Sequence, residues 1–161
     1  IPPAVKALQD LGMHRKVQLI VSGGIRTGAD VAKALALGAD AVAIGTAALV
    51  ALGDNDPKWE KEYEKLGTRA GCYDDWHEGK DPAGITTQTP ELTQRLDPVA
   101  AGRRLANYLK VLTLEAQTLA RACGKNHLHN LEPEDLVALT LEAAAMARVP
   151  LAGTSWVPGA R

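Results

Sequence analysis

The sequence contains no phenylalanine, and its 161 residues include only two cysteines, three tryptophans and three tyrosines. The cysteines, Cys72 and Cys123, lie far apart, and this spacing argues against both a disulfide framework and a zinc knuckle. Such sparse use of cysteine fits a reducing compartment, and we expect a cytoplasmic protein.

A large charge of either sign is also missing, because 18 Lys and Arg residues stand against 19 Asp and Glu residues, for a net charge of -1. Without a basic stripe, a nucleic-acid surface is not expected. No apolar run approaches the roughly 18 residues of a membrane span, and the first residues show neither a signal pattern nor an initiating Met. The composition, 46% apolar and 23% charged, is that of a globular domain with one core.

Two glycine-bearing segments each end a short apolar run. They are residues 21–28 (VSGGIRTG) and residues 44–47 (IGTA), and the ten residues 29–38 between them have the pattern of a helix. The order of strand, glycine loop, helix, strand and second glycine loop is how a (β/α)8 barrel binds phosphate after its last two strands. Glycines let backbone N–H groups approach an anion, and a helix N-terminus adds partial positive charge.

We therefore predict a phosphate site, and the amino-acid sequence of the motif indicates flavin mononucleotide (FMN) as the ligand. A turn that needs positive φ, without a ligand, is the alternative. Ser22 is expected at the strand tip, the amides of Gly24, Gly45 and Thr46 on the phosphate oxygens, and Arg26 either on the phosphate or in solvent. The predicted cofactor-binding residues are Ser22, Gly23, Gly24, Arg26, Gly45 and Thr46.

Helical patterns dominate the rest of the chain. We expect a helix that begins at Pro2 and ends at Gly12, strands over residues 17–21 and 40–44, and a short helix over 46–52. An amphipathic helix follows from Pro57, with Trp59, Tyr63 and Leu66 packed. Long helices are expected over 99–123 and from Pro133 to Pro150; their inner faces are Leu105, Leu109, Leu112, Ala116, Leu119 and Cys123, and Leu136, Leu139, Ala143 and Met146.

The predicted fold class is α/β: the C-terminal βα units of an FMN-binding (β/α)8 TIM barrel with a C-terminal helical extension. A complete barrel needs about 200–250 residues, and its last two loops come near its end rather than near its start. We divide the chain into the last two βα units (1–53), an irregular segment (54–98), and C-terminal helices with a tail (99–161). A C-terminal piece of a longer protein is favoured over a self-contained domain, and two strands alone are not expected to form a stable monomer.

Residues 17–52 resemble the FMN-phosphate segment of the glutamate synthase large-subunit family. Similar sequences occur in 2-hydroxyacid oxidases, inosine monophosphate dehydrogenases and type 2 isopentenyl diphosphate isomerases. This segment alone therefore indicates a superfamily and not a reaction. Residues 84–92 (GITTQTPEL) narrow the choice, because they resemble the family's G-[VI]-A-T-Q-[DN]-P-x-L. The resemblance implies an FMN-dependent enzyme of glutamate and amino-nitrogen metabolism, with other subunits or the rest of its own barrel as partners.

The sequence departs from this family where glutamate synthases bind a [3Fe-4S] cluster through C-x5-C-x4-C. The three corresponding places hold Ala70, Trp76 and Asp81, and Cys72 is the only cysteine nearby. One thiolate cannot hold such a cluster, so we expect it to be absent. The loop 72–82 resembles a cluster-free branch, that of methylamine–glutamate N-methyltransferase (N-methylglutamate synthase). Small substrates of the glutamate, 2-oxoglutarate or methylamine class are therefore implied.

The aromatics of this loop, Tyr73 and Trp76, are interpreted as filling the volume of the missing cluster rather than covering the flavin or a partner. His77 with Glu78 or Asp74 is a candidate acid–base group on the basis of loop position alone.

Other residue patterns carry less information. His127 and His129 lack a third ligand and fit a capping or surface role better than a metal site. We name no catalytic residue, since most substrate contacts would lie on strands that precede this segment. Two other functions stay open: a non-catalytic assembly or phosphate/nucleotide-binding piece, and another FMN-dependent TIM-barrel oxidoreductase.

Overall fold

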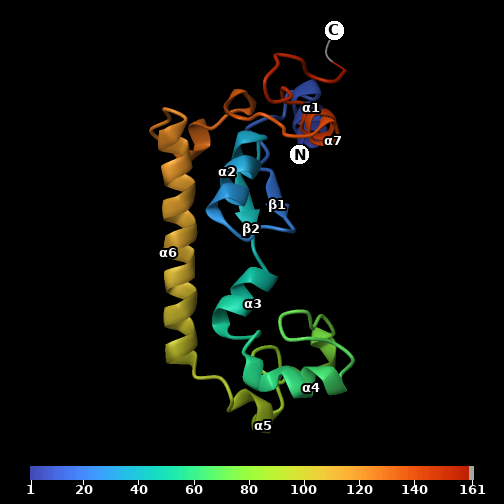
Figure 1. Ribbon diagram of the computed structural model, residues 1–161, viewed down its shortest axis with the longest axis vertical. Helices are drawn as coiled ribbons and strands as arrows, with labels where there is room; N and C mark the ends of the chain where they lie inside the picture. The colour runs from blue at the N-terminus through green and yellow to red at the C-terminus, as the bar shows by residue number, and fades with distance from the viewer. Residues whose placement is uncertain (160–161) are drawn as a thin grey trace. The chain divides into compact units, whose positions relative to one another are not determined.

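A computed structural model describes residues 1–159, apart from the side chain of Trp76 (Figure 1). The chain divides into two compact units, which we describe separately. The first joins Ile1–Ala43 to the chain from Val111 onward, and the second is Ile44–Lys110.

The first unit contains a β-α-β motif flanked by helices. Strands β1 (Ile20–Ser22) and β2 (Ala41–Ala43) are parallel, with Ile20 opposite Ala41 and Ser22 opposite Ala43. The other elements of this unit are α1 (Pro2–Asp10), α2 (Gly28–Ala36), the second half of α6 (Pro98–Ala122), the 3-10 turns η3 (Leu128–Asn130) and η4 (Pro133–Asp135), and α7 (Leu141–Ala147). The α/β class expected from the sequence is confirmed.

Both strands are shorter than the sequence predicted. Val17 lies outside β1 because its amide donates to the carbonyl of Met13 and closes a turn. Leu19 is held by Asp40, whose carboxylate accepts the Leu19 amide at 2.7 Å and whose own amide donates to the Leu19 carbonyl. Asp40 thus fixes the register at the beginning of both strands.

Helix α2 (Gly28–Ala36) lies within two residues of the predicted range 29–38 at both ends. Thr27 is its N-cap and forms a capping box with Asp30. Burial acts against ionisation of Asp30, but hydrogen bonds from Lys33, Arg26 and Thr27 lower its pKa to about 2. Gly38, with φ of 102°, ends the helix, and a Cβ there would lie 2.8 Å from Val5.

Alanines and a glycine bring α2 and α6 together. Ala116 of α6 is fully buried against Val31, Ala34 and Leu35 of α2. A Cβ on Gly28 would lie 2.4 Å from the carbonyl oxygen of Leu112 and 2.5 Å from the Ala116 amide nitrogen. The two backbones therefore touch at the first residue of α2, and only glycine fits there.

The C-terminal region differs from the single helix that was expected from Pro133. Residues 136–140 are extended because Ala138 pairs with the chain near Pro150: its amide donates to the Pro150 carbonyl, and its carbonyl accepts from Ala152, both at 2.8 Å. Thr140 then caps the short helix α7.

The predicted inner face of this helix is wrong at three of its four residues. Leu136 packs against buried residues, but Leu139 is 85% and Met146 is 78% exposed and Ala143 is exposed as well, while Ala144 and Val149 are buried instead. The prediction of a buried Cys123 is also wrong, since α6 ends at Ala122 and the thiol lies exposed beyond it.

The second unit consists of short helices around a buried tyrosine. Its elements are α3 (Thr46–Leu52), η1 (Pro57–Trp59), α4 (Glu60–Lys65), η2 (Trp76–Glu78), α5 (Pro90–Thr93) and the first half of α6. Tyr63 is fully buried, as its spacing predicted. Trp59 lies under the cationic groups of Lys58 and Arg95, each 4.7 Å from the ring centroid. Leu66, expected to pack, is 37% exposed.

We expect Gly28→Ala to destabilise the protein by at least about 2 kcal/mol, because a methyl group would displace backbone rather than a movable side chain. Urea unfolding of the complete protein measures the change.

Gly102→Ala is the matched control, since Gly102 lies within α6 and a Cβ there meets nothing within 4 Å. This variant should be neutral or gain up to about 1 kcal/mol from helix propensity. Equal stabilities for the two variants would contradict the close contact between α2 and α6.

Candidate functional site

The two glycine loops begin at the same edge of the β1–β2 sheet. Ser22 ends β1 and Ala43 ends β2, and these two residues are paired in a parallel ladder. Gly23 and Gly24 follow directly after Ser22, and Gly45 comes two residues after Ala43. The carboxyl edge of the two strands is therefore the origin of both loops.

The first loop exposes backbone on two consecutive glycines. Gly23 has φ of 105° and Gly24 has φ of 72°, and a Cβ on either would meet no atom within 4 Å. Gly23 directly follows the last pair of the ladder, whereas within residues 1–159 the Gly24 amide donates no hydrogen bond to another group of the chain. A backbone amide with this freedom can donate to an oxygen of an anion. Arg26, further along the loop, is exposed.

The second loop leads into α3, whose first residue is Thr46. Gly45 is the N-cap of this helix and supplies no side-chain cap, and a Cβ on Gly45 would meet no atom within 4 Å. In the part of the chain that the structure describes, the amides of Gly45 and Thr46 donate no hydrogen bond. These donors suit an oxygen ligand.

At the N-terminus of α2, in contrast, side chains of the protein already accept the backbone amides. The amides of Arg26 and Thr27 donate to a carboxylate oxygen of Asp30, both at 3.1 Å. The Gly28 amide donates to Oε2 of Glu115 at 2.7 Å. Two carboxylates therefore occupy the place where an external anion would meet this helix. No local signal in the sequence identified Glu115.

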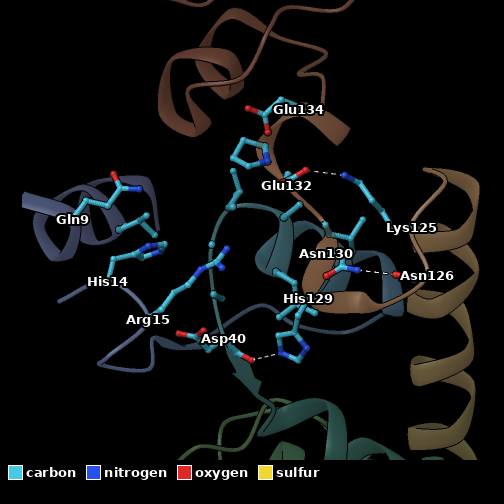
Figure 2. Close-up of a pocket in the computed structure, with 18 of the residues that line it drawn as sticks. Gln9, His14, Arg15, Asp40, Lys125, Asn126, His129, Asn130, Glu132 and Glu134 are labelled. Carbon is cyan, nitrogen blue, oxygen red and sulfur yellow. Dashed lines mark hydrogen bonds and ion pairs between the residues drawn. The ribbon is translucent and has the colours of Figure 1, made fainter. Parts of the chain in front are cut away.

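A groove of about 970 Å³ lies at the opposite, amino-terminal edge of the strands (Figure 2). Its wall includes His14 and Arg15, which precede β1, and Asp40, which precedes β2. Arg15 has φ of 63°, unusual for a residue with a side chain.

Charges of both signs line this groove. Lys125 pairs with Glu132 at 2.8 Å and with Asp135 at 3.4 Å. The groove does not include the residues of the predicted phosphate site.

The two histidines of the HxH pattern stabilise local backbone. His127 Nδ1 accepts the amide of His129 at 3.2 Å, and Nε2 of His129 donates to the carbonyl oxygen of Asp40 at 2.9 Å. The capping role favoured from the sequence is confirmed. Among residues 1–159, no three His, Cys, Asp or Glu side chains lie where they could hold a metal ion.

A buried polar cluster occupies the core of the second unit. The hydroxyl of Tyr63 lies 2.8 Å from Oδ1 of Asp54 and 2.8 Å from Oδ1 of Asp81. Both aspartates are buried, with exposed fractions of 1% and 0%. Asp81 also accepts the amides of Ala83, Ile85 and Thr86 at 2.8 to 3.0 Å and the Thr86 hydroxyl at 3.2 Å.

Counting protons in this cluster assigns the charges. Tyr63 has a single hydroxyl proton, so it can donate to only one of its two carboxyl neighbours. Burial opposes ionisation of Asp81, but its hydrogen bonds from Thr86, Tyr63, Ile85 and Ala83 lower its pKa. Burial raises the pKa of Asp54, and the charge of Asp81 adds to that effect. The opposite shifts favour the negative charge on Asp81 and the proton on Asp54.

This cluster includes the third of the three places at which the family carries cluster cysteines. The carboxylate of Asp81 is committed to the backbone of residues 83–86, which begin the motif 84–92. Ala70, at the first place, is half-buried, and Cys72 is exposed. Tyr73 is buried with its ring centroid 6.2 Å from that of Tyr63, in line with a packing role, while the side chain of Trp76 lies outside the described residues.

The acid–base group considered from the sequence has no supporting geometry. Asp74, His77 and Glu78 are all exposed, and Glu78 forms an ion pair with Lys80 at 3.2 Å. The sequence did not single out Asp54, because its carboxylate lies nine residues from Tyr63 without any motif.

We expect Asp54→Asn to change how stability depends on pH. The pKa of Asp54 is raised on folding, so wild-type stability from this group falls as pH rises from about 4, the unfolded value, through the folded pKa. Asparagine cannot ionise, so the stability of the variant relative to wild type should increase over that range. Urea midpoints measured between pH 4 and pH 8 test this.

Asp81→Asn serves as the opposite control. The pKa of Asp81 is lowered, so its contribution is present above about pH 4 and is lost as pH falls through the folded pKa. This variant should be less stable than wild type at neutral pH, with the difference shrinking in acid. A pH-independent difference for both variants would show that the proton is not placed on Asp54.

Comparison with known proteins identifies relatives over most of the chain. The family model described as "Conserved region in glutamate synthase" matches residues 1–60 and 65–126. A "Glutamate synthase large subunit-like protein" of Rhizobium meliloti (strain 1021) is 88% identical over 159 residues, which is 99% of this chain and 36% of the relative. No solved structure matches the chain.

More distant relatives match about three quarters of the chain. An "Archaeal glutamate synthase (NADPH)" of Methanocaldococcus jannaschii is 44% identical over 124 residues, which is 77% of this chain and 21% of the relative. A "Ferredoxin-dependent glutamate synthase" of Cyanidium caldarium is 32% identical over 117 residues, 73% of this chain and 6% of the relative. The chain thus spans about a third of the Rhizobium relative's length and about a fifth of the archaeal one's. None of the helices within residues 1–159 is long and apolar enough to cross a membrane.

Proposed function

Because the chain belongs to the glutamate synthase family, we propose that it forms part of an FMN-dependent enzyme of the glutamate synthase type and holds the phosphate of the flavin. One observation supports this most strongly. Two glycine loops with unbonded amides begin at the carboxyl edge of two parallel strands. This edge is where α/β folds of the barrel type bind phosphate. The flavin supplies the redox chemistry when bound, and the protein positions it.

The fold we propose for the whole protein is a (β/α)8 barrel of which β1, α2, β2 and α3 form the last two units. Parallel strands in such folds are covered on both faces, yet Ile20 in β1 is 64% exposed and both ends of β2 are exposed. The relatives are much longer than this chain, and the remaining strands of a barrel fit that difference.

Six residues bind the flavin phosphate in this proposal. The hydroxyl of Ser22 and the amides of Gly24, Gly45 and Thr46 donate to phosphate oxygens, Gly23 lets the backbone approach the phosphate, and Arg26 contributes a charge-assisted bond. The uncapped N-terminus of α3 adds partial positive charge, whereas α2 does not, because Asp30 and Glu115 already fill its first amides.

The reaction class within the family follows from the irregular segment. Its residues resemble the cluster-free branch, so we propose N-methylglutamate synthase as the activity, with glutamate and methylamine as substrates, ahead of glutamate synthesis from 2-oxoglutarate. The proposal includes no cluster. The buried carboxylate of Asp81 supports it, because at the third ligand place this side chain is fully used by neighbouring amides.

Two alternatives from other classes are separated by a simple measurement. A non-catalytic assembly or nucleotide-binding subunit would lack the flavin absorbance near 450 nm in the complete protein. Another FMN-dependent oxidoreductase would show that absorbance without turnover of glutamate or methylamine.

We expect Gly24→Asp to lower FMN affinity by at least 100-fold. The substitution places a side chain at φ of 72° and adds a negative charge where the phosphate is proposed to bind. Flavin content and FMN titration of the complete protein measure the effect.

Gly12→Asp is the control, because Gly12 has φ of 63° and equally open surroundings but lies after α1, outside both glycine loops. Its FMN content should stay at the wild-type level. Wild-type flavin content in Gly24→Asp would refute the phosphate assignment.

Iron and acid-labile sulfide should be well below one equivalent per chain in the anaerobically purified protein. The reason is that Ala70 and Asp81 stand where two of the three cysteine ligands would be needed. Elemental analysis and the visible spectrum of the FMN-depleted protein decide this. About three equivalents of iron with a cluster spectrum would contradict the cluster-free assignment.

A further inference from the structure

Glu115 connects helix α6 to the first glycine loop across a long sequence separation. Its Oε2 accepts the amide of Gly28 at 2.7 Å, and the two residues lie 87 positions apart. Gly28 is buried, so its amide cannot turn to water for a partner. Glu115 is the hydrogen-bond partner that the described chain offers this amide.

The chemistry of the helix end explains why an acceptor is needed there. The first amides of a helix have no carbonyl within the helix to bond. Asp30 satisfies the amides of Arg26 and Thr27 from inside α2, but the Gly28 amide faces α6. A buried amide left without an acceptor is costly, since its interaction with water has been given up.

The same contact fixes where the loop ends. Gly28 lies against the backbone of Leu112 and Ala116, with no room for a Cβ. At its other end the loop begins at Ser22, which is held in register with Ala43. Gly23 and Gly24 therefore lie between two anchored points, although the amide of Gly24 bonds to nothing in the described chain.

We propose that Glu115 is a positioning residue for the flavin phosphate: by accepting the Gly28 amide it holds the 23–27 loop in the geometry that presents the Gly24 amide. This inference rests on the proposed function and deepens it. Glu115 also supplies negative charge to the N-terminus of α2, so that this helix end does not compete for the phosphate.

Affinities for FMN and for riboflavin, which lacks the phosphate, separate positioning from a general loss of structure. In the flavin-depleted complete protein, Glu115→Ala should raise the Kd for FMN roughly tenfold, the size expected for one bond to a charged group. The Kd for riboflavin should change less than about twofold. Glu115→Gln keeps an acceptor oxygen and should restore FMN affinity to within about threefold of wild type.

Glu142→Ala is the matched control, because Glu142 is an exposed glutamate in the first turn of α7, away from the loop. Its affinities for both flavins should equal those of wild type. If Glu115→Ala does not fold, Glu115→Leu replaces it, since leucine suits a helix and has no hydrogen-bond acceptor.

Three outcomes would overturn the proposal. Unchanged FMN affinity in Glu115→Ala, or an equal loss for FMN and riboflavin, would show that Glu115 does not position the phosphate loop. Failure of Glu115→Gln to restore affinity would show that the charge, not the hydrogen bond, matters. If the wild-type protein itself binds no FMN, the proposed function fails. This outcome is distinguishable, because then neither wild type nor any variant shows FMN binding.

Discussion

The contact between the first residue of α2 and the backbone of α6 is the constraint on which the first unit depends. Gly28 allows the two helices to approach until a Cβ would overlap Leu112 and Ala116. Alanines on both helices permit this short distance, because larger side chains in their place would push the helix axes apart. The same approach brings the carboxylate of Glu115 to the buried Gly28 amide. The packing of the two helices and the hydrogen bond at the end of the glycine loop thus depend on the same close approach.

Carboxylates accept backbone amides at several places in the chain, and the amides of the glycine loops differ from these. Asp30, Glu115 and Asp40 each accept amides at a helix or strand terminus, and Asp81 accepts three amides in the second unit. The N-terminus of α2 is satisfied in this way by Asp30 and Glu115, whereas the amides of Gly24, Gly45 and Thr46 are not. These open donors suit a ligand that brings its own oxygen atoms.

Local signals in the sequence predicted the elements that local chemistry determines. Thr27 and Asp30 form a capping box, Gly38 ends α2, and the β-α-β order was evident from short apolar runs. Contacts between distant residues could not be predicted in this way. Nothing near Glu115 indicates a bond 87 residues away, and Tyr63 looked like ordinary packing because its hydroxyl partners lie outside its helix. The helix expected from Pro133 failed for the same reason, since pairing of Ala138 with the chain near Pro150 overrides its apolar periodicity.

The Tyr63 cluster orders part of the irregular segment through buried carboxyl groups. The carboxylate of Asp81 accepts the amides of Ala83, Ile85 and Thr86. Such an arrangement needs Asp81 ionised and Asp54 protonated at once, which their opposite pKa shifts allow. Both conditions hold only between the two folded pKa values, because below this range Asp81 gains a proton and above it two adjacent charges are buried together. Ordering by this pair of carboxyl groups therefore makes the segment sensitive to pH from both sides.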